Sequence, residues 1–203
     1  MILKNAKIVD DSFRLRNADI AVDGDRISAI GPALSDGEEY DFTGCVIVPG
    51  FIDIHIHGCV GADTCDADAE GLAKMCEHLV REGITSFCPT TMTVSHEEIG
   101  RALGVVRECM LHPPKGAAIA GVNMEGPYIS PHKKGAQAGE YVKNPDFAEF
   151  KDYYDTYGGI IKLVDIAPEC PGAEDFIRQA SKFCTVSIAH TAADYASARH
   201  AFD

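Results

Sequence analysis

Two histidines separated by one residue, His55 and His57, end the apolar run in the segment PGFIDIHIHG. Side chains of a β-strand alternate between its two faces, so residues two apart point the same way. Both imidazoles should therefore lie on one face, with Ile54 and Ile56 on the other. Paired imidazoles at a strand end indicate half of a metal site, because histidine nitrogen is a common ligand of zinc. Two hydrogen-bonded core histidines are the alternative.

Two more potential ligands follow other apolar runs. Glu125 comes at the end of AAIAGVNMEG, and His190 at the end of TVSIAHT. Taken singly, Glu125 could be a turn carboxylate and His190 a packed histidine. Together with the first pair they make a set of imidazoles and one carboxylate, which suits zinc, with iron or another divalent ion as alternatives. Such a metal polarises a carbonyl and activates water, so the set predicts hydrolysis of an amide or ester.

These residues need a fold that brings the ends of separate strands together. From Phe51 onward, apolar runs alternate with helical patterns. Predicted strands span residues 51–57, 84–90, 117–126, 160–169 and 185–191, and predicted helices span residues 68–83, 95–111, 145–158, 172–184 and 194–203. This alternation indicates parallel strands with helices outside. In a (β/α)8 barrel, active-site residues gather at the carboxyl ends of the strands.

The predicted fold class is therefore α/β, of the (β/α)8 TIM-barrel type, incomplete with about five strand–helix units over residues 50–203. A doubly wound sheet is disfavoured because no Gly-x-Gly-x-x-Gly loop follows the first strand. The four candidate ligands follow the first, third and fifth strands of this fold. Asp165 and Glu169, near the end of the fourth strand, are less well placed.

Local signals define several helix ends and one buried face. Gly83 suits the C-terminal cap of the first helix, Ser95 and Glu98 form a capping box before the second, and Pro145 lies near the start of the third. An apolar stripe at helical spacing is predicted to be the buried face of the first helix, and it consists of Leu72, Met75, Cys76, Leu79 and Val80.

Residues 1–49 form a separate predicted unit. The segments LKNAKIVD, ADIAVDGDRISAIG and CVIVPG indicate short strands, with a turn at the DGD of the second segment. Such a small β-sheet cannot bury both of its faces alone. We therefore expect it to be part of a composite β-sandwich that needs strands from elsewhere.

Composition limits the classes of partner. The chain has 203 residues and a formal net charge of -13, so nucleic acid and anionic membrane surfaces should repel it. It contains no apolar stretch long enough to span a bilayer and no secretory signal pattern. The eight cysteines form no Cys-x-x-Cys pair. Reduced thiols and a cytoplasmic location are the expectation.

Three segments in a fixed order carry a family resemblance. PGFIDIHIHG, NMEGPYISPHKKGAQ and SIAHTAADYASARHAFD resemble the amidohydrolase superfamily and, within it, the N-acetylglucosamine-6-phosphate deacetylases. Many amidohydrolases share the first segment. The Glu-Gly-Pro-aromatic sequence followed by Lys-Lys-Gly-Ala is the more specific part.

The resemblance implies roles for named residues. Glu125 and His190 match metal ligands of the family, and His55 and His57 match the pair that binds a second metal in members that keep it. One or two ions are therefore expected. The segment Ala136–Gln137 matches the part of the loop that touches the sugar, although the family often has histidine in place of the glutamine. The resemblance also implies a homodimer.

The implied reaction is metal-dependent deacetylation of N-acetylglucosamine 6-phosphate, a small amino-sugar phosphate, to glucosamine 6-phosphate and acetate. The family's catalytic aspartate and its remaining metal- and phosphate-binding residues would lie beyond Asp203, so no catalytic residue is assigned and the chain is expected to be truncated. One alternative is another amidohydrolase, of the dihydroorotase or deaminase type. The other is a non-catalytic fragment that pairs through its open strand edges.

Overall fold

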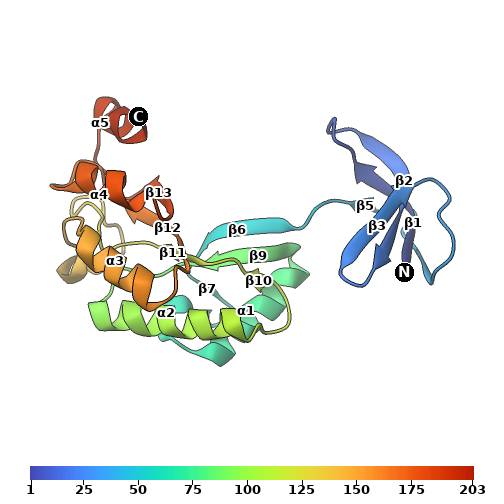
Figure 1. The fold of residues 1–203 in the computed structure, drawn as a ribbon, viewed down its shortest axis with the longest axis horizontal. Coiled ribbons are helices and arrows are strands. Elements are labelled where there is room, and N and C mark those ends of the chain that lie inside the picture. The colour runs from blue at the N-terminus through green and yellow to red at the C-terminus, as the bar shows by residue number, and fades with distance from the viewer. The chain divides into compact units, whose positions relative to one another are not determined.

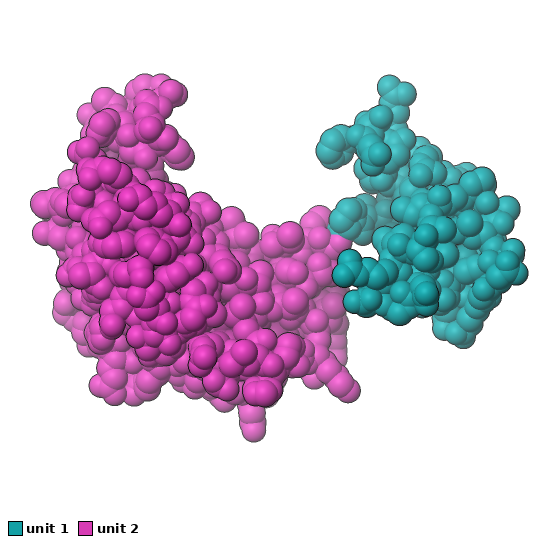
Figure 2. Space-filling view, viewed as in Figure 1, with its two compact units in different colours: residues 1–49 teal, residues 50–203 magenta.

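A computed structural model describes residues 1–203 and divides them into two units, Met1–Pro49 and Gly50–Asp203, which Figure 2 shows in different colours. No helix in either unit combines the length and the apolar character that crossing a membrane requires. All eight cysteines are free thiols.

The first unit is one five-stranded sheet. Its strands are β1 (Ile2–Val9), β2 (Leu15–Asp23), β3 (Arg26–Gly31), β4 (Glu39–Asp41) and β5 (Val46–Ile47). The order is β3-β2-β1-β4, and β5 also pairs with β1. A tight turn at Gly24, whose φ is +59°, joins β2 to β3 where the sequence predicts a turn. The apolar cluster of this sheet is small, with only Ile8, Ala18 and Ile20 buried in it. The composite β-sandwich stays a prediction.

The second unit alternates strands with helices (Figure 1). Its main strands are β6 (Phe51–Ile56), β9 (Ile84–Pro89), β10 (Ala118–Ile119), β11 (Val122–Met124), β12 (Ile161–Ile166) and β13 (Thr185–Ile188). Its helices are α1 (Ala69–Arg81), α2 (His96–Leu111), α3 (Phe147–Thr156), α4 (Ala173–Ala180) and α5 (Tyr195–Phe202). Smaller elements are the hairpin of β7 (Gly58–Cys59) and β8 (Ala62–Asp63) and the short 3-10 helices η1 (Thr64–Asp66) and η2 (Gly139–Tyr141).

All pairings between the main strands are parallel, and each strand pairs with the next one along the chain except at the step from β10 to β11. The strands form two groups, β6-β9-β10 and β11-β12-β13, which a single bridge between Thr90 and Asn123 connects. Parallel pairing in sequence order places the carboxyl ends of all strands along one edge. The candidate ligands are brought together at that edge.

The third predicted strand differs from the structure. The sequence indicates one strand over residues 117–126, but the chain forms β10 against β9 and then β11 against β12. The break lies at Gly121, whose φ is +150°. A Cβ atom there would lie 2.2 Å from Lys162 Cγ and 2.7 Å from the Ile160 carbonyl oxygen. Only glycine permits this close approach of neighbouring backbone, so the strand changes partner at this residue.

Helix α1 shows both the success and the limit of the periodicity. Leu72, Met75, Cys76 and Leu79 are buried as predicted, but Val80 is 43% exposed, so its inclusion in the buried stripe is wrong. The physical reason is that a residue after Leu79 lies about 100° further round the helix, beyond the stripe.

The capping box before α2 is confirmed. In α3 the N-cap is Asp146, one residue after the proline that the sequence places near the helix start.

Candidate metal centre

His55 and His57 lie at the end of β6 and share a face, as strand alternation predicts. Their ring centroids are 5.2 Å apart and the rings are nearly perpendicular. The buried amide of Asn123, from β11, donates from Nδ2 to the Ile54 carbonyl at 3.0 Å and lies 3.3 Å from His55 Nδ1. On the other ring, His57 Nδ1 lies 3.2 Å from the Thr90 carbonyl oxygen. Groups from β11 and from the end of β9 therefore fix both rings.

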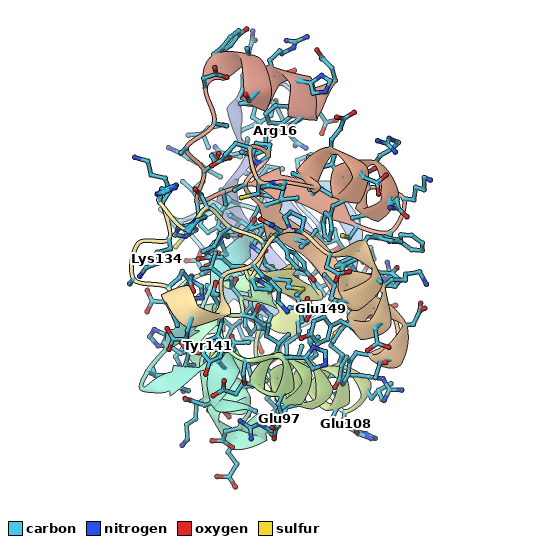
Figure 3. The ribbon with its side chains drawn as sticks, turned by 90° about the vertical axis from the view of Figure 1, so that its left-hand side faces the viewer. Arg16, Glu97, Glu108, Lys134, Tyr141 and Glu149 are labelled. Atoms are coloured by element: carbon cyan, nitrogen blue, oxygen red, sulfur yellow. The ribbon has the colours of Figure 1, made fainter.

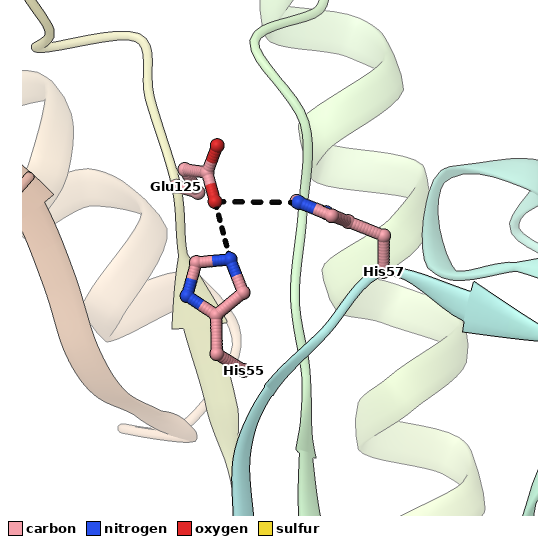
Figure 4. Close-up of side chains that lie close together, drawn as sticks. All are labelled: His55, His57 and Glu125. Atoms are coloured by element: carbon pink, nitrogen blue, oxygen red, sulfur yellow. Dashed lines mark ion pairs between the residues drawn. The ribbon is translucent and has the colours of Figure 1, made fainter. Parts of the chain in front are cut away.

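Glu125 follows β11 and its side chain is only 2% exposed. One carboxylate oxygen, Oε2, lies 2.5 Å from His55 Nε2 and 3.3 Å from His57 Nε2 (Figure 4). The ligand atoms of these three residues all lie within 4.8 Å of one another. The other oxygen, Oε1, lies 2.9 Å from His190 Nε2. The structure thus brings all four sequence-predicted ligands around one buried carboxylate.

His190 comes two residues after β13, with a φ of +45°. Its Nδ1 donates to the Lys133 carbonyl at 2.8 Å, and its own carbonyl accepts from the Ser130 N–H at 3.0 Å. Both contacts come from residues 127–144, which we call the 127–144 loop. Figure 3 shows this loop where Lys134 is labelled. The loop therefore holds His190 in place from a part of the chain some sixty residues earlier.

These contacts define which ring nitrogens can bind a metal. A carbonyl oxygen only accepts hydrogen bonds, so Nδ1 carries the proton in both His57 and His190. Nε2 of each neutral ring then has a lone pair directed at the Glu125 carboxylate. Such an arrangement of acceptors requires a cation, either a proton on an imidazole or a metal ion between the groups. Neutral imidazoles whose other nitrogen donates to a carbonyl are a frequent arrangement at zinc sites, so the residues fit a divalent metal.

The electrostatics of the cluster keep Glu125 ionised. Burial by itself would raise the pKa of the carboxyl group. When the imidazoles are protonated, the hydrogen bond from His57 and the charges of His57, His55 and His190 outweigh burial and lower the pKa of Glu125 to about 2. In return, the hydrogen bond to Glu125 raises the pKa of His57 against the opposing effect of its burial. The Glu125 carboxylate therefore supplies a negative charge to a cation bound among these groups.

Two acidic residues near the end of β12 have different positions. Asp165, which the sequence pattern places less well, is 2% exposed, and its Oδ2 has no hydrogen-bond partner. Burial raises the pKa of Asp165, and Glu125 is close enough to add to the rise. Glu169 instead accepts from Thr191 Oγ1 at 2.5 Å and from the Ala192 N–H at 2.6 Å. It anchors the segment after His190 and does not face the cluster.

A cavity of about 490 Å³ opens beside the carboxylate. It is lined by His55, His57, Met92, Glu125, Ala136, Gln137, Ala189 and His190. The two predicted substrate contacts are thus next to the predicted metal ligands. Ala136 is exposed, whereas the Gln137 side chain is buried and reaches the Glu125 carboxylate. Sequence patterns give no sign of that contact.

Comparison with known proteins agrees with this geometry. The model of the amidohydrolase family matches residues 46–203, which is most of the chain. The chain belongs to the amidohydrolase family. This family assignment was predicted from the segments around His55, Glu125 and His190.

Individual amidohydrolases give a narrower likeness. The chain is 35% identical over 204 residues to an N-acetylglucosamine-6-phosphate deacetylase of Bacillus subtilis, covering 97% of this chain and 52% of that protein. It is 34% identical to an N-acetylgalactosamine-6-phosphate deacetylase of Escherichia coli O157:H7, covering 95% of this chain and 50% of that protein.

A solved structure extends the likeness to the fold. The crystal structure of an N-acetylglucosamine-6-phosphate deacetylase from Pasteurella multocida matches with a TM-score of 0.89 and 31% identity. The match covers 99% of this chain and 53% of that one. The chain therefore has the α/β fold of these amidohydrolases and spans about half the length of the relatives it matches.

Proposed function

We propose that this chain contributes the metal-binding half of an amidohydrolase that deacetylates N-acetylglucosamine 6-phosphate to glucosamine 6-phosphate and acetate. The observation that carries the proposal is the buried Glu125 carboxylate, which meets imidazoles from β6 and from the end of β13. The likeness to deacetylases of this substrate over nearly the whole chain supports the choice of reaction.

The metal would be held by Glu125 and His190, with His55 and His57 completing the set or holding a second ion. When bound, a zinc ion or another divalent ion polarises an amide carbonyl and lowers the pKa of water. The residues of the chain orient the metal ligands and provide the negative charge. The Thr90 and Lys133 carbonyls keep the His57 and His190 rings in the tautomer that presents Nε2, and Glu125 contributes the negative charge.

The substrate would enter the cavity beside Ala136, with its acetamide group toward the imidazoles. The loop residues Lys133 and Lys134 carry positive charge on the segment next to this cavity in a chain that is otherwise strongly acidic. We assign no proton-transfer residue within these 203 residues. Since the relatives are about twice as long, we expect the group that protonates the leaving amine to come from the part of the fold that they add.

We further propose that the parallel strands of the second unit are part of a (β/α)8 barrel. Support comes from the parallel pairing and from the first and last main strands, β6 and β13, each of which pairs on one side only. Ile52 and Ile54 on β6 are 67% and 53% exposed, which is unusual for a barrel strand and is explained if further strands cover them. The first unit would belong to a composite β-sandwich. The protein would act as a homodimer. Its location would be the cytoplasm, a compartment that suits its free thiols.

A second candidate substrate is N-acetylgalactosamine 6-phosphate. The Escherichia coli relative named for that substrate is 34% identical to this chain, nearly as similar as the Bacillus subtilis protein. The two sugars differ only in the configuration of one hydroxyl group.

The test has two parts, metal binding and acetate release. Zinc content of the purified protein should fall at least tenfold in Glu125→Gln and stay unchanged in Glu140→Gln, a matched change on η2. The product of the whole gene should release acetate from N-acetylglucosamine 6-phosphate in a zinc-dependent manner. Turnover of dihydroorotate or of a deaminase substrate in its place would contradict the proposed reaction, and loss of neither zinc nor activity in Glu125→Gln would contradict the site.

A further inference from the structure

Gln137 occupies an unusual place for a residue expected to touch a sugar. Its side chain is 4% exposed and bridges two elements next to the candidate metal centre. On one side its Oε1 accepts a hydrogen bond of 2.7 Å from the Thr93 backbone N–H, at the end of the segment that follows β9. On the other side its Nε2 donates to Glu125 Oε1.

The chemistry of the two partners fixes the orientation of this amide. A backbone N–H can only donate, so the amide oxygen must face Thr93. The amide nitrogen must then face Glu125, whose ionised carboxylate can only accept. Turning the amide over would place two acceptors together on one side and two donors on the other. Gln137 therefore has one satisfactory orientation, and in it the N–H points at the candidate metal ligand.

The backbone around Gln137 is held as firmly as its side chain. Its N–H donates to the Lys134 carbonyl at 3.0 Å, and its carbonyl accepts from Lys134 Nζ at 2.9 Å. Thr93 in turn packs against the residue after the ligand, because a Cβ atom on Gly126 would lie 2.0 Å from Thr93 Oγ1. Glu125, the Gln137 amide and the segment after β9 are therefore joined by a continuous set of contacts.

Few polar groups of Gln137 remain to recognise a substrate. The single oxygen is engaged by Thr93 and one N–H by Glu125, while Nε2 lies 3.8 Å from Met92 Sδ. The neighbouring Ala136 is exposed in the cavity.

We propose that Gln137 is a positioning residue that holds the Glu125 carboxylate in the orientation facing the three imidazoles, and that it does not contact the sugar. This proposal rests on the metal site proposed above. Hydrogen-bond partners of a metal ligand stop its rotation and keep its lone pairs directed at the ion, and their loss typically lowers metal affinity about 10- to 100-fold. Sugar contact at this part of the loop would then fall to the exposed Ala136.

The first experiment measures zinc affinity without substrate. Gln137→Met keeps the length of the side chain but removes the donor and the acceptor. The matched control is Gln179→Met, which changes the only other glutamine, on α4, where it bonds to Asp175. By competition with a chromophoric chelator, we expect the zinc dissociation constant to rise about 10- to 100-fold in Gln137→Met and to stay within twofold in the control.

The second experiment needs no variant and so does not depend on the folding of Gln137→Met. With ¹⁵N label in glutamine side chains, the protein gives two pairs of amide resonances. We expect the Gln137 pair to exchange slowly with solvent and to shift when zinc is added, while the Gln179 pair is unaffected. A zinc-induced shift reports the contact with Glu125 directly.

The outcomes separate the two proposals. If the wild type binds zinc and Gln137→Met binds it equally well, or if the Gln137 amide does not respond to zinc, the positioning role is refuted and the metal site stands. If the wild type does not bind zinc, both proposals are refuted. Weaker zinc binding together with a zinc-sensitive amide supports the positioning role.

Discussion

Removing one hydroxyl group from Tyr128 should destabilise the second unit measurably. Tyr128 lies three residues after Glu125 and is fully buried. Its hydroxyl donates to Glu149 Oε2 at 2.9 Å, while Glu149 Oε1 lies 2.5 Å from Lys143 Nζ and 3.2 Å from His96 Nδ1. Glu149, labelled in Figure 3, is on α3, His96 begins α2, and the other two residues belong to the 127–144 loop. This cluster therefore ties the loop that holds His190 to two helices.

The expected loss in free energy of unfolding depends on the hydrogen-bond partners that the Glu149 carboxylate keeps. A hydrogen bond to a charged group contributes about 1.5–3 kcal/mol to stability. In Tyr128→Phe the Glu149 carboxylate keeps Lys143 and His96 at Oε1, so its charge stays paired although Oε2 loses its partner. The ring of Tyr128, 5.0 Å from that of Phe176 between centroids, is retained. We expect the free energy of unfolding to fall by about 1.5 kcal/mol, at the low end of that range.

Urea unfolding followed by circular dichroism measures the change. With a slope of about 2 kcal/mol per molar urea, the midpoint of Tyr128→Phe should be about 0.7 M lower than that of the wild type. Tyr154→Phe is the control. Tyr154 is half-buried, but its hydroxyl makes only an exposed 3.4 Å contact with the Phe183 carbonyl, so the expected change is below about 0.5 kcal/mol. Equal midpoints for Tyr128→Phe and the control would refute the reasoning.

Three further changes test other parts of the structure. The hydrogen bonds of Glu149 to Lys143, Tyr128 and His96 outweigh its burial and lower its pKa below the usual 4.5. The stabilisation by this carboxylate is therefore present above pH 4.5 and is lost as the pH falls further. In acid denaturation series, the stability difference between wild type and Glu149→Gln should shrink below pH 4.5. Gly126→Ala should lower the melting temperature far more than Gly61→Ala, because both residues have positive φ but only the first Cβ would clash. Phe176→Ala should reduce the free energy of unfolding by about 3–5 kcal/mol in urea titrations, since this ring is buried in the core, and a loss below about 1 kcal/mol would contradict that packing.

Sequence periodicity was sufficient where a contact is set by local geometry. Alternation along one strand predicts that His55 and His57 share a face, and helical spacing predicts the buried side of α1 at four positions. Neither pattern carries information about which strands become neighbours. Linking the histidine pair to Glu125 and His190 required the parallel strand–helix alternation and the family resemblance.

Contacts between distant segments account for what the sequence did not predict. The break at Gly121 arises from the approach of Ile160 and Lys162, about forty residues later. The bond between Gln137 and Thr93 joins residues 44 positions apart. Each of these contacts depends on the final packing of neighbouring strands, which no local propensity encodes.

Backbone groups provide much of the organisation of the metal centre. The Thr90 and Lys133 carbonyls set two histidine tautomers, and the Thr93 N–H sets the amide that meets Glu125. A side-chain substitution does not remove a backbone group, so these restraints persist as long as the strand ends and the 127–144 loop keep their fold. All of them lie within residues 50–203. We therefore expect metal binding to depend on the second unit and turnover to depend in addition on the strands that the longer relatives contain, so that the two properties can be separated by experiment.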